Sequence, residues 1–284
     1  MKLVARYCEL VKFEHTLFAL PFALISLLVA TAGRPPARML LWVLAAMVAA
    51  RSAAMAFNRL ADREYDRRNP RTASRHLPAG RVSTRGAALF TLGAAALFVF
   101  AASRLNALCF ALSPIALGVV LLYSYAKRFT ELSHLWLGLA LAIAPVGAWL
   151  AATGALAAFP LWTAAGVALW VTGFDIIYGC QDVDFDRREG LRSLAARLGV
   201  RRALRLARAA HALAVVALAL AFAGGPRLGP AALAGVAVAA ALLVLEHRLV
   251  RGGDLTRLDA AFFAVNSWIG VVLLAAVALD LWLI

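Results

Sequence analysis

The sequence predicts an all-α, polytopic membrane protein with nine transmembrane helices. Of its 284 residues, 63% are hydrophobic, and the mean hydropathy is +0.82. Apolar runs of about 18 or more residues recur along the chain, and each is long enough to cross a bilayer as a helix. Helices are favoured because a helix satisfies its own backbone hydrogen bonds in lipid. We expect residues 1–284 to form one transmembrane domain or a pseudo-duplicated bundle.

The expected spans alternate with two kinds of connection. Short turns rich in Gly and Pro lie on one side of the membrane, and long polar loops at 58–83, 126–133, 179–205 and 248–260 lie on the other. The first span follows charged residues without a convincing cleavage site, so we interpret it as a retained helix. The spans are 16–33, 39–57, 84–103, 106–125, 134–152, 160–178, 206–224, 229–247 and 261–282.

The basic residues indicate an orientation. Of the 29 Lys and Arg residues, 24 lie on the side of the N-terminus and the long loops, and four lie on the other side. The positive-inside rule therefore predicts a protein of the inner (plasma) membrane, with its N-terminus cytoplasmic and its C-terminus outside. Because this topology accounts for most of the net charge of +14, we expect membrane lipid and no nucleic acid as a partner. No obligate protein partner is evident.

A first motif of metal-binding residue types ends the second span. Asn58, Asp62 and Asp66 are spaced by four, which places all three on one helical face. Carboxylates that could hold a hard cation stand among arginines that could hold phosphate, which suggests a metal–diphosphate site. The alternative is a solvated, charged helix end. The interleaved or following arginines are Arg63, Arg67, Arg68, Arg71 and Arg75.

A second motif follows the sixth span. Asp175, Tyr178, Asp182 and Asp186 share one helical face, whereas Asp184 points elsewhere if the helix persists. Of these residues, we expect Asp175 to contact the substrate. Two clusters of carboxylates on one side of the membrane would repel each other unless cations lie between them. Mg²⁺ fits, since it takes one or two carboxylates together with phosphate oxygens of a substrate.

Four further residues are candidates for substrate contacts. Arg51 lies inside a span, where a charge is costly and marks either a structural ion pair or an anion-binding group. Tyr125, Lys127 and Arg128 end the fourth span, either as an aromatic anchor and topogenic charges or as groups that close over a phosphate or carboxylate. By contrast, the histidines at 134, 211 and 247 have no partners at metal-ligand spacing.

Three segments in order resemble the UbiA-type intramembrane aromatic prenyltransferases. NRLADREYDRRNPRT is similar to the first family motif, DIIYGCQDVDFDRREGLRS to the second, and YSYAKRFT to the element between helices 4 and 5. The resemblance implies nine helices around a central cavity and two Mg²⁺ ions that bind a polyprenyl diphosphate. It assigns one metal to Asn58, Asp62 and Asp66 and the other to Asp182 and Asp186. Diphosphate or acceptor contacts would come from Arg71, Lys127 and Arg128.

The resemblance also implies the reaction. Metal and cationic side chains stabilise the leaving diphosphate, and an electron-rich aromatic ring attacks the allylic cation. Asp182 and Tyr178 are candidates for removing the ring proton. The acceptor is expected to be an aromatic acid, either 4-hydroxybenzoate or 1,4-dihydroxy-6-naphthoate, whose carboxylate Arg51 or Arg128 suits. The product would be a precursor of a respiratory quinone, ubiquinone or menaquinone.

Other functions remain open at this point. Another aromatic acceptor is one alternative. A transporter is a second, although it would place its ionisable residues near mid-membrane rather than at helix ends. A CDP-alcohol phosphotransferase would need a DG-x-x-AR motif, which the sequence lacks.

Overall fold

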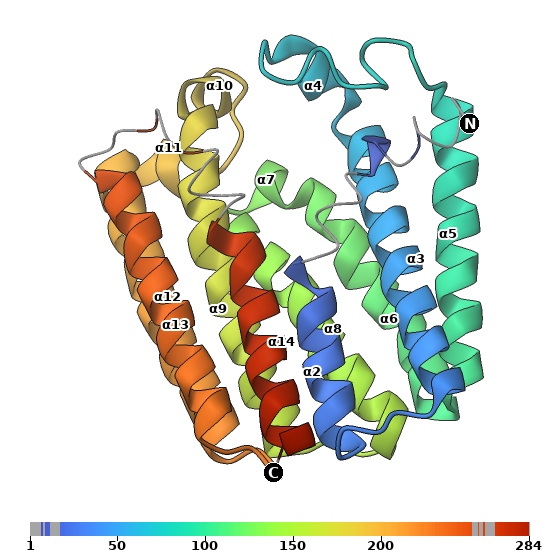
Figure 1. The fold of residues 1–284 in the computed structure, drawn as a ribbon. Helices are drawn as coiled ribbons and strands as arrows, with labels where there is room; N and C mark the ends of the chain where they lie inside the picture. Colours follow the sequence, from blue (N-terminus) through green and yellow to red (C-terminus); the bar gives the residue numbers. More distant parts are fainter. Residues whose placement is uncertain are drawn as a thin grey trace. The chain divides into compact units, whose positions relative to one another are not determined.

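The chain folds into two compact units, each with its own hydrophobic core. The computed structural model describes residues 18–251 and 265–283, together with Tyr7, residues 9–11, Leu255 and Leu258. The first unit comprises Met1–Thr16 and Leu41–Tyr125, and the second comprises Leu17–Leu40 and Ala126–Ile284. All regular structure in the described residues is helical (Figure 1).

Eight described helices are long and apolar enough to cross a membrane. They coincide with eight of the nine expected spans, and this confirms a multi-pass, all-α membrane protein. The expected first span, 16–33, coincides with a helix of only 11 residues, Leu20–Ala30, and its residues 16 and 17 lie outside the described part. Residues 261–264 of the last expected span also lie outside it. The count of nine helices and the central cavity therefore stay predictions.

Between residues 41 and 125, the first unit is built from three long helices and two short ones. The side chain of Asn106 accepts a hydrogen bond from the backbone N–H of Cys109 at 2.8 Å, which caps α6 and joins it to α5 as a hairpin. A small core beneath the loop after α4 includes Leu77, Val82 and Ala87. The elements are α3 (Ala37–Ala61, whose first four residues belong to the second unit), α4 (Arg63–Arg68), α5 (Thr84–Leu105), α6 (Ala107–Leu122) and η2 (Tyr123–Tyr125).

The second unit contains the remaining helices and the largest core. That core is built mainly from aromatic and aliphatic side chains of α2, α8, α9, α12, α13 and α14. The elements are α2 (Leu20–Ala30), α7 (Ala126–Phe129), α8 (Ser133–Thr153), α9 (Ala158–Gly179), η3 (Cys180–Asp182), α10 (Val183–Arg188), α11 (Leu194–Leu198), α12 (Val200–Ala223), α13 (Pro230–Leu249) and α14 (Asn266–Leu283).

Helix α9 is the centre of the second unit because glycines let its neighbours approach closely. It packs most extensively against α12 and α8. Gly173 faces the ring of His211 from α12, and Gly138 of α8 faces the carbonyl of Ala168 in α9. A Cβ atom at either glycine would overlap these groups. Small residues at helix crossings allow such close packing in membranes, where the hydrophobic effect does not drive helix association. The helix that carries the second motif is thereby held from two sides.

A buried polar network connects α9 with α12, α13 and α14. Trp170 Nε1–H donates to Asn266 Oδ1 at 2.7 Å, and Asn266 Nδ2–H donates to Glu246 Oε1 at 2.8 Å. His211 Nδ1 lies 3.0 Å from His247 Nε2. The structure therefore brings together two histidines that lack partners at metal-ligand spacing in the sequence. Since burying polar groups requires hydrogen bonds, this network fixes the register of four helices.

Helix α14 also holds the ends of two other elements. The buried carboxylate of Asp280 accepts hydrogen bonds from the backbone N–H groups of Gly229, Ala231 and Ala232, at 2.8, 3.2 and 2.7 Å. These are orphan donors at the start of α13, and an anion there also favours the helix dipole. Trp282 Nε1–H donates to the carbonyl of Gly33, just beyond α2, at 2.9 Å.

Candidate active site

The first motif lies across a break in helical geometry. Helix α3 ends at Ala61, and Asp62, with φ −95° and ψ 7°, precedes the short helix α4. Two backbone hydrogen bonds of i→i−4 type continue through the break: Asp62 N–H to the Asn58 carbonyl at 2.9 Å, and Asp66 N–H to the Asp62 carbonyl at 2.7 Å. The four-residue spacing therefore keeps its effect, and the three side chains stay on one side of the chain.

The side chains of the first motif already have partners within their unit. Asn58 Nδ2–H donates to Asp62 Oδ2 at 2.9 Å and to Ser124 Oγ at 3.5 Å. Asp66 is 5% exposed, and its Oδ1 pairs with Arg75 at 2.7 Å. Its Oδ2 is buried and accepts no hydrogen bond from the described residues. An unsatisfied carboxylate oxygen is a strong acceptor for a cation.

The second motif repeats the same break. Helix α9 ends at Gly179, a turn of 3₁₀ helix follows, and Asp182 precedes the short helix α10. Asp182 has φ −97° and ψ 7°, nearly the angles of Asp62. Each unit thus ends a long helix with an aspartate in the sparsely populated bridge region, followed four residues later by a buried aspartate. This local repeat is the kind of similarity that a pseudo-duplicated bundle would have, and the domain organisation stays a prediction.

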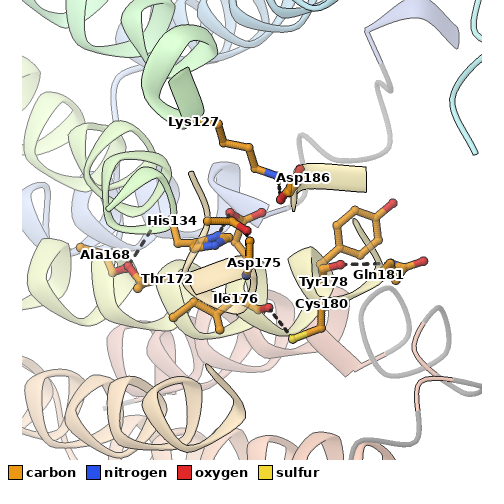
Figure 2. Close-up of polar contacts among 12 residues, drawn as sticks. Lys127, His134, Ala168, Thr172, Asp175, Ile176, Tyr178, Cys180, Gln181 and Asp186 are labelled. Atoms are coloured by element: carbon orange, nitrogen blue, oxygen red, sulfur yellow. Dashed lines mark hydrogen bonds and ion pairs between the residues drawn. The ribbon is translucent and has the colours of Figure 1, made fainter. Parts of the chain in front are cut away.

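The last aspartate of the second motif pairs with a cation, as Asp66 does. Asp186 is 1% exposed, and its Oδ2 lies 3.3 Å from Lys127 Nζ (Figure 2). Asp184 is exposed, as expected from its position between two residues of the motif. The loop after α10 is fastened to the same segment, because the N–H of Arg192 donates to the Lys127 carbonyl at 2.7 Å and its guanidinium to the Phe129 carbonyl at 2.8 Å.

The first residue of the second motif has a partner that sequence reasoning missed. His134 Nδ1, at the start of α8, lies 2.7 Å from Asp175 Oδ2 in α9 (Figure 2). The two residues are 41 positions apart, so no local spacing could reveal the pair. One signal was available: a histidine at the start of an apolar helix is costly in lipid unless it has a polar partner.

The other candidate residues differ in their surroundings. The ring of Tyr125 packs edge-on against Phe57 with centroids 5.8 Å apart, next to Asn58. Arg71 and Arg128 are exposed, and Tyr178 is half-buried. Arg51 is half-buried within α3, seven residues before Asn58 as expected.

The donor set fits a hard divalent cation that a substrate shares. In the part of the chain that the structure describes, no group of three or more His, Cys, Asp or Glu side chains could hold a metal alone. Each motif instead offers two aspartates spaced by four residues. Oδ2 of Asp66 is buried and has no hydrogen-bond partner among the described residues. Mg²⁺ is commonly bound by one or two carboxylates and completed by substrate phosphates and water. The residues present therefore fit Mg²⁺ together with a phosphate ligand.

The sequence of residues 19–278 matches the model of the UbiA prenyltransferase family. The chain belongs to this family. It is 32% identical over 267 residues to the 4-hydroxybenzoate octaprenyltransferase of Vibrio atlanticus (strain LGP32), which covers 94% of the chain and 93% of the relative. It is also 32% identical to the enzyme of the same name from Nitrosospira multiformis (strain ATCC 25196 / NCIMB 11849 / C 71), over 88% of the chain and 86% of the relative.

Solved structures share the UbiA fold. A UbiA homolog from Aeropyrum pernix K1 in its apo form superposes with a TM-score of 0.86 at 36% identity, covering 94% of this chain and 98% of that one. A UbiA homolog from Archaeoglobus fulgidus bound to GPP and Mg²⁺ superposes with a TM-score of 0.69 at 21% identity, covering 96% and 99%. The second likeness supports the fold alone.

Family membership decides between the broad alternatives. The chain is a membrane-embedded prenyltransferase, so the transporter alternative is wrong. The relatives named above carry 4-hydroxybenzoate in their names, and they give no specific support to the naphthoate.

Proposed function

We propose that this UbiA-family enzyme transfers a polyprenyl group from a polyprenyl diphosphate to the ring of 4-hydroxybenzoate, in a Mg²⁺-dependent step of ubiquinone biosynthesis. The observation that carries the proposal is the repeated helix break, with Asp62 and Asp182 at matching backbone angles and a buried, cation-paired aspartate after each. The names of the curated relatives support the acceptor and the transfer.

In this proposal the two motifs provide the ligands for the metal. Asn58, Asp62 and Asp66 would hold one Mg²⁺, and Asp182 and Asp186 a second. When bound, Mg²⁺ neutralises the negative charge that develops on the leaving diphosphate. The amide of Asn58 already orients the Asp62 carboxylate, and Arg75 and Lys127 pair with the two buried aspartates.

The remaining candidates would contact the substrates. Ser124 contacts Asn58 within the first unit, and Lys127 contacts Asp186 within the second. On release of its aspartate, Lys127 could donate to a diphosphate oxygen, as could Arg71 and the exposed Arg128. Tyr125, held by Phe57, offers a hydroxyl beside the first motif.

The acceptor needs a group for its carboxylate and a group near its ring. Arg51 suits the carboxylate because a half-buried guanidinium binds a carboxylate in a bidentate manner. Asp182 or Tyr178 would take the ring proton after prenyl transfer. We also propose that the chain forms a single transmembrane domain whose N-terminus and motifs lie on the cytoplasmic side. The distribution of Lys and Arg supports this orientation.

The first experiment is a product analysis. Purified protein is incubated with Mg²⁺, a polyprenyl diphosphate and either 4-hydroxybenzoate or 1,4-dihydroxy-6-naphthoate, and products are identified by mass. We expect prenylated 4-hydroxybenzoate and release of one diphosphate per product. Exclusive prenylation of the naphthoate would overturn the acceptor assignment and indicate menaquinone biosynthesis.

A variant pair tests the role of the metal-binding motifs. Asp62→Ala should abolish acceptor-dependent diphosphate release, whereas the matched exposed residue of the second motif, Asp184→Ala, should retain it. Release that survives Asp62→Ala would remove the first motif from the metal site.

A further inference from the structure

Asp175 is too far along its helix to serve the metal that Asp182 would hold. The two residues are seven positions apart, which corresponds to about 10 Å at the helical rise of 1.5 Å per residue. Two ligands of one Mg²⁺ ion lie within about 4 Å of each other, since each Mg–O bond is about 2.1 Å. The absence of a three-residue metal cluster among the described residues agrees. The carboxylate of Asp175 therefore has another task, inside α9 and about two turns before Asp182.

The surroundings of Asp175 are built to hold its carboxylate in one orientation. The side chain of His134 is 1% exposed, and its Nδ1 lies 2.7 Å from Asp175 Oδ2. Gly179, one turn after Asp175, leaves room for the imidazole: a Cβ atom there would lie 2.9 Å from His134 Cε1. Thr172 Oγ1 donates to the Ala168 carbonyl at 2.6 Å and lies 3.5 Å from the His134 carbonyl (Figure 2). The imidazole is wedged between α8 and α9, so it can turn little.

The hydrogen-bond pattern fixes which proton His134 carries. A carboxylate only accepts hydrogen bonds, so the contact places a proton on Nδ1. Nε2 is buried and has no hydrogen-bond partner among the described residues. The imidazole thus makes its one side-chain hydrogen bond with Asp175, whose side chain is 16% exposed. Asp175 is thus an oriented and partly accessible hydrogen-bond acceptor.

We propose that His134 is a positioning residue that holds the Asp175 carboxylate to accept a hydrogen bond from the ring hydroxyl of the aromatic acceptor. The ligand class is an aromatic ring with a free hydroxyl, because a fixed carboxylate binds a hydroxyl donor and repels a diphosphate. A hydrogen bond to this hydroxyl directs electron density into the ring that attacks. The inference rests on the proposed prenyl transfer and adds to it the site for the acceptor hydroxyl.

The test compares two isosteric variants. In His134→Asn the amide nitrogen takes the place of Nδ1 and can still donate to Asp175, whereas in His134→Gln it takes the place of Nε2 and points away. We expect His134→Gln to lower kcat/KM for 4-hydroxybenzoate about 10–100-fold, the loss expected from a misplaced group. His134→Asn should recover most of this loss. The Kd of polyprenyl diphosphate and Mg²⁺, measured by titration without acceptor, should stay as in the wild type for both variants.

A double-mutant cycle shows whether His134 acts through Asp175. If it does, His134→Gln in an Asp175→Asn background should cause no further loss. Additive losses, equal activity of the Gln and Asn variants, or a weaker Kd for the diphosphate would each overturn the inference. A wild-type protein that forms no prenylated aromatic product would instead overturn the proposed function, so the two failures are distinguishable.

Discussion

Arg75 offers a test of metal binding that does not depend on catalysis. Its guanidinium holds Oδ1 of the buried Asp66 at 2.7 Å, while Oδ2 has no hydrogen-bond partner among the described residues. In Arg75→Ala, Oδ1 loses the guanidinium, so that neither oxygen keeps a hydrogen-bond partner among the described residues. We therefore expect the variant to be destabilised without metal and to regain stability when Mg²⁺ takes the place of the guanidinium.

The size of the effect follows from burial. Breaking a fully buried ion pair by removing one partner costs about 3–5 kcal/mol. The Asp66 side chain is 8% exposed, but that of Arg75 is 30% exposed, so water screens part of the loss. We expect about 2 kcal/mol, which corresponds to a decrease in Tm of about 4–8 °C for a chain of this size.

The assay is thermal unfolding in detergent, with and without Mg²⁺. Arg67→Ala is the matched control, since Arg67 pairs with Glu64 at 2.6 Å on the surface, with exposed fractions of 64% and 50%. Its Tm should change by less than about 2 °C, because exposed ion pairs contribute little. Mg²⁺ should raise the Tm of Arg75→Ala more than that of the wild type, by the mass action of a ligand for the folded state.

Two results would refute this reasoning. One is an equal Tm for Arg75→Ala and Arg67→Ala, which would mean that Asp66 tolerates burial without a cation. The other is a Mg²⁺-induced increase in Tm that is the same in Arg75→Ala and the wild type, which would mean that Asp66 does not bind the metal.

Three further predictions concern other parts of the chain. Asp186→Ala should reduce turnover at least about 100-fold, whereas Asp184→Ala on the same short helix should leave it unchanged; diphosphate release measures both. Asp280→Ala should lower the unfolding free energy by about 2–4 kcal/mol, because three backbone N–H groups lose a charged acceptor; SDS titration would show the shift, and an unchanged midpoint would contradict it. Asn266→Ala should lower the unfolding free energy by about 3 kcal/mol, because the buried Trp170 and Glu246 each lose a hydrogen-bond partner. The control is Ser267→Ala, a half-buried neighbour, and the same SDS titration compares the two variants.

The membrane helices could be predicted from the sequence because lipid imposes a simple rule. Expected spans such as 84–103 and 134–152 agree within two residues with Thr84–Leu105 and Ser133–Thr153. The grouping of Asn58 with Asp62 was equally accessible, since four-residue spacing puts side chains together whether or not the helix bends. For the same reason the spacing could not reveal the break at Asp62, because the i→i−4 hydrogen bonds persist through it.

Contacts between distant segments could not be predicted from one sequence. His134 pairs with Asp175 and Lys127 with Asp186 across 41 and 59 positions, and helical period carries no information about partners on another helix. The network around Asn266 was missed for a similar reason: each of its members looks like an isolated polar residue in an apolar run. A general rule would have identified them as a group, since a polar side chain within a span needs a partner.

The contacts of Asp280 and Trp282 have a consequence for biogenesis. Helix α14 leaves the ribosome after α2 and α13, yet it supplies the acceptor for the first N–H groups of α13 and the donor for the carbonyl of Gly33. While α13 enters the bilayer, the N–H groups of its first turn must therefore form hydrogen bonds with water or lipid headgroups instead. Insertion of α14 releases those temporary partners and locks two earlier helices in the same event. A nascent chain arrested before residue 280 should accordingly remain more sensitive to protease at the α12–α13 connection than the finished protein.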